Sequence, residues 1–559
     1  MERKPTSSAL NSSSSSSSQP TVTATCSHLS DDCWEFIFRL IIDDDDNRIK
    51  LRYLKPLSLV SKQFLSVTNR LRLSLTVYDP SYLRSIFKRF TNLNSLHLAS
   101  NCTHSDNLLR QISRFPLKQL TSLSLSNQRS IPTNGLRAFS QNITTVTSLN
   151  CSHIRSLNRF DLFLIAECFP LLEELDLSYP SRCKNYAIYV DGVEALSIAL
   201  IKLRKVNLSG FPINNQSLFH LFNNCKYLEE VIMFSCNEIT SVGLASAICE
   251  RPTLRSISVS TMGGSEVFAT SHFIDSLVSL KGLTCLVLHY LNISDELLYS
   301  IAREGLPLTR LDLHCCNGYS YAGIFRLLSK CQRIQHLNLE GADYLNDQHV
   351  VQLFSFLGDL VSINLSHCYK ISESTLFALP KSCPSLSEIK MERIGSDVVA
   401  NSDSLGEFGV YPQLKALYLG DNSWLSDESI IMFASIFPNL QLLDLKFCDH
   451  ISEVPKLEVL NLSATKVDDE TLYVISKNCS GLMQLQLDHC NRVTKKGVKR
   501  VLKNRRQLGE HGCIIPSSLV FRESELCACH GGALGHRGMF ICWNFGLSQS
   551  TTLARYMQF

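Results

Sequence analysis

Apolar residues recur along most of the chain in one fixed pattern. An apolar residue is followed by two others, then an apolar residue, one other, and a third apolar residue, as in the copies that begin at Leu172, Leu308 and Leu482. The first positions of the 16 copies are 93, 120, 146, 172, 203, 228, 254, 283, 308, 334, 360, 386, 414, 440, 457 and 482. Of the 15 spacings, seven equal 26 residues and most others lie between 25 and 29. A period of this size predicts a stacked repeat array rather than one compact core.

The second half of the repeat is equally regular. Eight residues past the first apolar position stands Cys236, Cys316, Cys368, Cys448 or Cys490, and once Asn101. An apolar or aromatic residue follows three positions later, and then, in the five cysteine copies, a serine or threonine, which is a favoured helix N-cap. We therefore expect a short strand, a turn and a helix in each repeat, with successive strands parallel.

The cysteine at the turn is expected to be a small buried residue. A disulfide or zinc site would favour Cys-x-x-Cys pairs, and the 22 cysteines include none. Four further cysteines, which stand three residues before a repeat begins, are expected to be buried in the same way: Cys225, Cys331, Cys383 and Cys479.

The repeat resembles the cysteine-containing class of leucine-rich repeats over about Leu93 to Leu508. The resemblance implies an α/β fold, a right-handed solenoid or horseshoe with a concave parallel sheet and convex helices. One repeat departs from this period. The spacing from Leu440 to Leu457 is only 17 residues, as the deletion of a helix, or of a helix and a whole repeat, would leave. We expect the sheet to be disturbed there, with part of the core exposed, because parallel strands need a longer crossover.

The segment before the repeats predicts a small helical module. Residues 29–40 read as a capped amphipathic helix, and residues 57–65 as a second helix beyond the acidic stretch Asp43–Asp46. So short a module leaves apolar surface exposed unless a partner covers it.

These two helices resemble an F-box, a motif that docks on a Skp-type adaptor and thereby on a cullin. The residues that the resemblance assigns to adaptor binding are Leu29, Ile37, Phe38, Leu40, Leu57, Leu59, Val60 and Phe64. The domain organisation expected is a disordered serine-rich tail at 1–26, the F-box-like module at 27–75, the solenoid at 76–508 and an aperiodic, disordered tail at 509–559.

The composition limits the classes of partner and the cellular locations to be expected. Hydrophobic residues make up 45% and charged residues 19%, and lysine plus arginine exceeds aspartate plus glutamate by only 54 − 51 = 3. Nucleic acid is therefore not an expected partner. No uninterrupted apolar run reaches membrane-spanning length, and the N-terminus lacks a secretory apolar core, so we expect a nuclear or cytoplasmic protein without membrane association. No cofactor or metal is expected, and the cysteines and histidines of the tail fit no common zinc pattern.

A solenoid of this kind binds partners with the strand residues that point outward. The candidate substrate-binding residues are Tyr186, Tyr189, Lys205, Glu230, Arg310, Asp312 and Lys390. Other outward positions are Glu174, Asp176, Asn207, Asn338, Asn364, Glu388, Asp444 and Asn461. The two tyrosines belong to an insertion at 182–189, and a second insertion carries Met262–Ser265. Insertions project from one edge of such an array.

The resulting hypothesis is a non-catalytic, substrate-recognition subunit of an SCF-type ubiquitin ligase, whose protein substrate the sequence does not name. Phosphate-binding loops, nucleophile elbows and His-Glu-x-x-His motifs are absent from the sequence. Two alternatives stay open. One is an interaction scaffold whose helices have lost adaptor binding. Two features favour it: the acidic stretch Asp43–Asp46, and Ser30 in place of the proline that is usual in an F-box. The other is a small-molecule co-receptor of the same architecture.

Overall fold

The structure is a computed structural model. It describes residues 29–41, 54, 56–78, 80–99, 104–181, 189–260, 268–395, 409–448, 457–479, 482–504, 508, 513–515 and 519. The serine-rich tail, the acidic stretch, Tyr186, the segment 262–265 and most of the predicted C-terminal tail lie outside these residues. The chain divides into an N-terminal unit (1–125 with 134–146) and a C-terminal unit (126–133 with 147–559).

The N-terminal unit begins with helices and continues as the first repeats. Its elements are α1 (Asp31–Ile41), α3 (Lys62–Leu71), β1 (Ser74–Val77), η1 (Pro80–Tyr82), α4 (Leu83–Arg89), β2 (Ser95–Leu98), α5 (Ser105–Ile112), β3 (Ser122–Ser124) and α6 (Thr133–Asn142). Strand β2 pairs in parallel with β1 and with β3. Helix α3 contacts α4 through Asn69, whose Oδ1 accepts a hydrogen bond from Nε of Arg89 at 2.9 Å.

The C-terminal unit alternates strands and helices through the remaining repeats. Its elements are β4 (Ser148–Asn150), α7 (Arg159–Cys168), β5 (Glu174–Asp176), α8 (Val190–Ala199), β6 (Lys205–Asn207), α9 (Asn215–Asn224), β7 (Glu230–Met233), α10 (Ser241–Cys249), β8 (Ser256–Ser260), α11 (Ser271–Val278), β9 (Cys285–His289), α12 (Asp295–Glu304), β10 (Arg310–Asp312), α13 (Tyr321–Lys330), β11 (His336–Asn338), α14 (Asp347–Phe354), β12 (Ser362–Asn364), α15 (Glu373–Ser382), β13 (Glu388–Lys390), β14 (Ala416–Tyr418), α16 (Asp427–Ile436), β15 (Leu442–Asp444), β16 (Val459–Asn461), α17 (Asp469–Asn478), β17 (Gln484–Gln486), α18 (Lys495–Asn504) and β18 (Cys513–Ile514).

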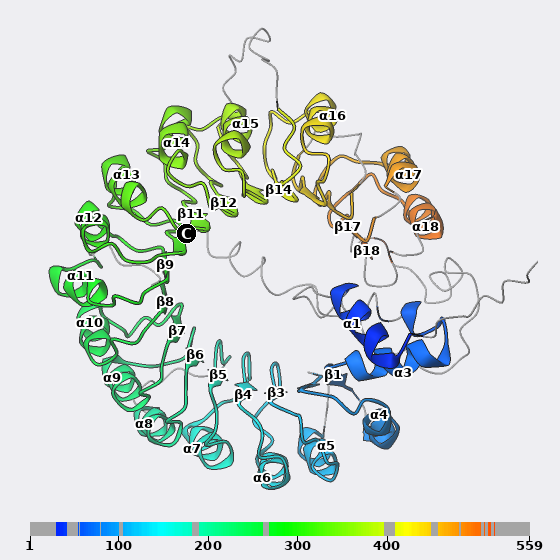
Figure 1. The fold of residues 1–559 in the computed structure, drawn as a ribbon, viewed down its shortest axis with the longest axis vertical. Helices are drawn as coiled ribbons and strands as arrows, with labels where there is room; N and C mark the ends of the chain where they lie inside the picture. Colours follow the sequence, from blue (N-terminus) through cyan, green and yellow to red (C-terminus); the bar gives the residue numbers. More distant parts are fainter. Residues whose placement is uncertain are drawn as a thin grey trace, which may run out of the picture. The chain divides into compact units, whose positions relative to one another are not determined.

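The strands of the C-terminal unit pair in parallel and in one register. The central residue of each strand stands opposite the central residue of the next, as Leu337 stands opposite Ile363 and Ile363 opposite Ile389. These central side chains are all buried. The helices line the outer side of this curved array and the strands its inner side (Figure 1). The predicted α/β solenoid with a parallel sheet is confirmed.

An aspartate or asparagine ends many of the strands. Its Oδ1 accepts a hydrogen bond from the backbone N–H two residues later, at 2.9–3.2 Å, at Asn150, Asp176, Asn207, Asp312, Asn338, Asn364, Asp444 and Asn461. The next residue along, three positions past the aspartate or asparagine, has a positive φ in every copy, a backbone conformation that such a turn can accommodate. Side chains that the sequence offered as outward binding residues therefore close the strand ends.

The five cysteines at the turn are buried, as predicted. Each Sγ lies within hydrogen-bonding distance, 3.0–3.4 Å, of a backbone carbonyl oxygen in the preceding repeat, for example Leu339 O for Cys368. The serine or threonine that follows caps its helix at Thr240, Ser320, Ser372 and Thr494. The fifth residue predicted to cap a helix, Ser452, lies outside the described residues.

The short repeat does not disturb the sheet, contrary to expectation. Strand β15 pairs with β16 in the register of the other repeats, Leu443 opposite Leu460, and both side chains are fully buried. Asn461 Nδ2 also donates a hydrogen bond to Asp444 Oδ2 at 2.9 Å. The segment 449–456 that connects the two strands lies outside the described residues. Seventeen residues are thus enough to bring the second strand beside the first.

The sheet also extends past residue 508, where the sequence predicts the solenoid to end. Cys513 and Ile514 form β18, which pairs in parallel with β17, Cys513 opposite Leu485. Because Cys513 stands opposite Leu485, the first position of this repeat falls on Glu510, which is not apolar, and the apolar pattern therefore missed the strand. Among the described residues, no helix has the length and apolar character needed to cross a membrane.

The turn cysteine provides a test of this packing. Cys368→Leu should lower the free energy of unfolding by about 1–3 kcal/mol, because a larger side chain overpacks a closed slot. Cys249 is exposed, so Cys249→Leu should change it by less than about 0.5 kcal/mol. Urea unfolding followed by circular dichroism measures both; equal effects would contradict the packing described for the turn.

Candidate functional site

The first candidate surface is the helical module of the N-terminal unit. Its core contains Phe38, Leu54, Val67 and Leu71, with Trp34, Ile37, Leu57 and Phe64 packed against it. The Phe38 and Phe64 rings meet edge to face with centroids 4.9 Å apart. Phe38 is only 1% exposed, so its assignment to adaptor binding is wrong: helix α1 turns this side chain inward against α3.

A second set of apolar side chains in the same module faces solvent. Leu59 is 81% exposed, Val60 66%, Leu40 63% and Leu29 41%. The two most exposed precede α3, whose N-cap is Ser61; its Oγ accepts a hydrogen bond from Phe64 N at 3.1 Å. The second helix therefore begins later than the predicted residue 57, which leaves Leu59 and Val60 in the preceding turn.

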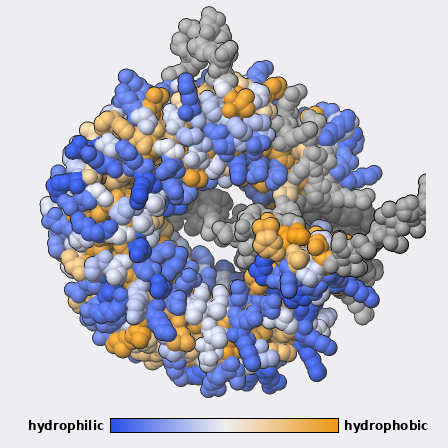
Figure 2. All heavy atoms as spheres, in the orientation of Figure 1, coloured by the Kyte–Doolittle hydropathy of each residue, from blue (hydrophilic) through white to orange (hydrophobic). Residues whose placement is uncertain are grey.

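Phe36 belongs to this exposed set, although the sequence did not single it out. It is 63% exposed, and it lies four residues before Leu40 on α1, which places both on one side of the helix. Figure 2 shows hydrophobic side chains gathered over α1. Comparing Phe36 and Phe38 by helical position could have suggested that they face opposite ways. We call Leu29, Phe36, Leu40, Leu59 and Val60 the apolar face.

Polar contacts hold the two helices of the module together. Arg70 on α3 contacts Asp31 at 3.0 Å and Glu35 at 3.3 Å, both on α1. Gln63 Nε2 also donates a hydrogen bond to Asp31 Oδ1 at 3.0 Å. The hydrogen bond from Gln63 is the larger cause, and that from Arg70 the second, of a pKa of Asp31 below its ordinary value. The contacts fix α1 against α3 and so define the shape of the apolar face.

The second candidate surface is a hollow of about 780 Å³ on the inner side of strands β5–β10. It is lined by Glu173, Glu174, Arg204, Lys205, Glu229, Glu230, Phe234, Arg255, Ser256, Ser258, Thr284, Cys285, Val287, His289, Arg310 and Asp312. The small residues of β8 and β9 lie between longer charged side chains on the neighbouring strands. Four predicted substrate-binding residues, Lys205, Glu230, Arg310 and Asp312, come together here.

Charges in this hollow are paired between neighbouring repeats. Lys205 Nζ lies 2.8 Å from Glu230 Oε1, and Arg204 lies 3.0 Å from Glu229. These pairs are partly exposed, so each contributes little to stability. These ion pairs instead hold the long side chains in defined positions. A charged group of a bound partner can replace one member of such a pair at the surface.

Asp312 is the exception among the four predicted residues. It is only 6% exposed, its Oδ1 accepts the backbone N–H of His314 at 3.2 Å, and it lies 3.1 Å from Nε2 of His289. Burial alone would raise the pKa of Asp312, but the contact with His289 holds the pKa below its ordinary value. The His289 ring stacks on Phe234, with centroids 4.9 Å apart and planes at 6°. Asp312 therefore anchors a histidine rather than meeting a substrate directly.

The remaining predicted substrate contacts lie elsewhere. Lys390 pairs with Glu388 at 2.9 Å and lies over the Tyr418 ring, 4.9 Å from its centroid, outside the hollow. Tyr189 is 6% exposed; its hydroxyl donates to Leu157 O at 2.8 Å and its ring packs against Phe211. Tyr189 is thus a core residue at the start of α8, not a surface contact. Tyr186 lies outside the described residues.

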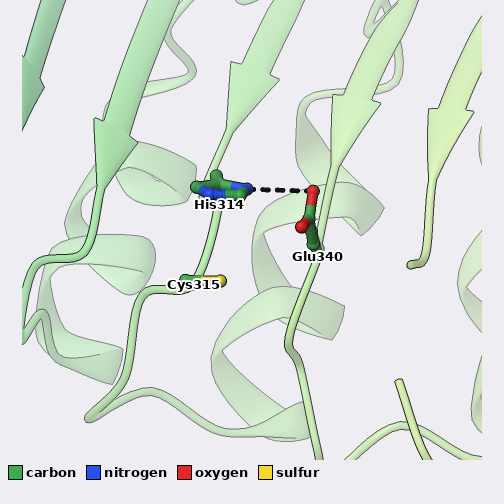
Figure 3. A group of neighbouring side chains, drawn as sticks. All are labelled: His314, Cys315 and Glu340. Carbon is green, nitrogen blue, oxygen red and sulfur yellow. Dashed lines mark ion pairs between the residues drawn. The ribbon is translucent and has the colours of Figure 1, made fainter. Parts of the chain in front are cut away.

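A cluster next to the hollow was not predicted. His314 Nδ1 lies 2.9 Å from Glu340 Oε2 (Figure 3). His314 Nε2 lies 2.7 Å from the hydroxyl of Tyr290. Burial by itself would lower the pKa of His314, but contacts with Cys315, Glu340 and Tyr290 raise it to about 11. The only signal for this cluster in the sequence is its place, two or three residues past the strand-ending Asp312 and Asn338.

Comparison with known proteins gives the following. No protein-family model matches the chain. The chain is similar to a chain in the crystal structure of the Rad7 and Elc1 complex in yeast, with 16% identity, coverage of 89% of this chain and 94% of that chain, and a TM-score of 0.45. It is also similar to an internalin, InlF, from Listeria monocytogenes strain 4b F2365, with 14% identity, coverage of 69% and 94%, and a TM-score of 0.31.

The pairing of His314 with Glu340 predicts a pH-dependent contribution to stability. Because the pKa of His314 is raised on folding, the contribution is complete below pH 6.5 and is lost as pH rises toward 11. His314→Gln should therefore lower the free energy of unfolding by on the order of 1–2 kcal/mol at pH 6 and by less at pH 10.

Denaturant unfolding in metal-free buffer at pH 6, 8 and 10 measures the difference between wild type and variant. His336→Gln is the control, because burial lowers the pKa of His336 and its effect should not decline with rising pH. A His314→Gln effect that is constant from pH 6 to pH 10 would contradict the prediction.

Proposed function

We propose that this chain is the substrate-recognition subunit of an SCF-type ubiquitin ligase. In this proposal the helical module docks on a Skp-type adaptor, and through it on a cullin, by the apolar face. The inner side of the strands binds the protein to be ubiquitinated. The proposal assigns no catalytic residue to the chain, whose contribution is to raise the local concentration of substrate at the conjugating enzyme.

The single observation that carries the proposal is the apolar face itself. The module's core holds only a few large side chains, while five other apolar side chains, between 41% and 81% exposed, gather in the same two-helix region. Burying a leucine or valine side chain contributes about 1.5–3 kcal/mol, so this face supplies enough free energy for a stable interface. Its residues include Leu29, Leu40, Leu59 and Val60, which the F-box resemblance also assigns to adaptor binding.

The hollow supports the other half of the proposal. Charged side chains on neighbouring strands, among them Lys205, Glu230 and Arg310, surround small residues such as Ser256 and Ser258. Such a surface suits a polar protein segment, whose hydrogen bonds and charges set specificity more than affinity. The sixteen cysteines of the described part are all free, which agrees with the proposed nuclear or cytoplasmic location.

Adaptor binding is tested with the full chain and a purified Skp-type adaptor. Leu59→Ala/Val60→Ala should weaken binding by roughly 30- to 100-fold, because two exposed side chains that would be buried at the interface are truncated. Isothermal titration calorimetry or surface plasmon resonance measures the Kd. Phe38→Ala is unsuitable as a test because Phe38 is in the core, and its loss would unfold the module.

The matched control is Ile198→Ala/Val242→Ala. These two side chains are 60% and 56% exposed on the helices of the repeats, so their truncation should leave the Kd unchanged within about twofold. A folded wild-type chain that fails to bind the adaptor would overturn the proposal and leave the interaction scaffold. Equal weakening by both double variants would show that binding does not use the apolar face.

A separate variant tests the hollow. Lys205→Glu/Arg310→Glu should leave adaptor binding unchanged, while it abolishes ubiquitination of proteins that co-purify with the wild-type chain in a reconstituted ligase. Lys390→Glu, outside the hollow, is the control. Loss of ubiquitination with Lys390→Glu alone would place the substrate on another part of the sheet.

A further inference from the structure

Three side chains of different chemistry converge at the ends of β10 and β11. His314 and Cys315 follow β10, and Glu340 follows β11. One nitrogen of His314, Sγ of Cys315 and a carboxylate oxygen of Glu340 all lie within 4.8 Å of one another. All three residues are half-buried. Figure 3 shows His314 directed toward Glu340, with Cys315 beside them.

The local backbone explains why two successive residues can contribute to one site. In a regular strand, the side chains of His314 and Cys315 would point to opposite faces. Here the strand has ended: Asp312 accepts the backbone N–H of His314, and Cys315 has φ of 49°. The chain therefore turns between them, and both side chains reach the same region.

Space for the sulfur is provided by a glycine on the next repeat. Gly341 has φ of 77°, and a Cβ added to it would lie 3.3 Å from Sγ of Cys315. A side chain at position 341 would therefore crowd the thiol, besides straining the backbone. Glycine at this position leaves Sγ open to the space beside Glu340.

The other atoms of the cluster have partners that would orient metal ligands. His314 Nε2 contacts the Tyr290 hydroxyl at 2.7 Å, which leaves Nδ1, on the side of Glu340, to coordinate. Asn364 Nδ2 donates a hydrogen bond to Glu340 Oε2 at 2.8 Å. Partners of this kind fix the ring orientation of a metal-bound histidine and the position of a metal-bound carboxylate.

We propose that His314 Nδ1, Cys315 Sγ and the Glu340 carboxylate form a Zn²⁺ site with an open fourth position. The combination of nitrogen, sulfur and oxygen ligands suits zinc, which binds at about 2.0–2.3 Å to each and favours tetrahedral geometry. Ligand atoms in such a geometry lie about 3–4 Å apart, so small rotations of Cys315 and Glu340 complete the site. His314 and Cys315 each release one proton when zinc binds, and no oxidation or reduction takes place.

The open position gives the site its role. The three ligands lie beside the hollow, since Asp312 both lines the hollow and holds the backbone of His314. A zinc ion there can take water, His367, whose Nε2 lies 3.9 Å from Glu340 Oε1, or a histidine, cysteine or carboxylate of a bound protein. The site is thus a metal-dependent contact point on the partner-binding side of the sheet. It stands independently of adaptor docking.

The test uses the full, reduced chain with Co²⁺ as a spectroscopic substitute for Zn²⁺. Wild type should show a thiolate-to-cobalt charge-transfer absorption when Co²⁺ is added. This absorption should need one more equivalent of Co²⁺ to saturate in wild type than in Cys315→Ser. Zn²⁺, added in competition, should remove this absorption. Absorption from Co²⁺ bound by other cysteines is the same in wild type and in Cys315→Ser, so it cancels when the two spectra are subtracted. Cys249→Ser, an exposed thiol on α10, is the control and should keep the full absorption.

Two further variants separate coordination from a general loss of folding. Tyr290→Phe should weaken the affinity for Zn²⁺ by about 10- to 100-fold, because the hydroxyl that orients the metal-binding histidine is lost. The chain should stay folded. Zn²⁺ should raise the melting temperature of wild type and not that of His314→Gln. Identical cobalt spectra for wild type and Cys315→Ser, or an equal zinc-induced shift in wild type and His314→Gln, would overturn the proposal and leave an ion pair alone.

Discussion

The constant register of the parallel strands is the constraint on which the rest of the C-terminal unit depends. One buried leucine, isoleucine or valine stands opposite the next in each pair from β4 to β17. Neighbouring strands lie about 4.8 Å apart, so equivalent side chains of successive repeats are brought into contact. A shift by one residue would move the apolar side chains out of the core and the charged ones into it.

This register separates structural from binding residues among the polar side chains of the inner surface. Asp176, Asn207, Asp312 and their equivalents close the strand ends, and the residue three positions later takes a left-handed backbone. The residues available to a partner are therefore those two positions before each strand-ending residue and those two positions after it. Lys205 and Arg310 are in the first group. His314 is in the second, as is His289, which lies two positions after Val287, the residue opposite Asp312. Most of their charges are paired with a neighbouring repeat, so recognition requires matched polar contacts rather than attraction by net charge.

How much could be predicted from the sequence depends on whether the decisive contact lies within the repeat. The strands that carry the apolar pattern, β2 to β17, repeat with the period, as do the buried cysteines and the helix caps, and these could be predicted; β18 could not. Tyr189 could not be assigned correctly, because its burial depends on contacts with Leu157 and Phe211 in other repeats. The pairing of β15 with β16 was also unexpected, because the length of the connection alone says nothing of where the second strand lies. In the helical module, the sequence indicated which residues are apolar but not which of Phe36 and Phe38 is buried, since the packing of α1 on α3 decides it.

The most direct test of the account is amide hydrogen–deuterium exchange of the full chain, with and without a purified Skp-type adaptor. The account predicts slower exchange in residues 29–41 and 56–65 when the adaptor is bound, because these segments carry the apolar face. Exchange in the strands of the C-terminal unit should stay the same. Binding that leaves residues 29–41 and 56–65 unprotected, or that protects the strands instead, would contradict the assignment of the helical module as the adaptor-docking surface.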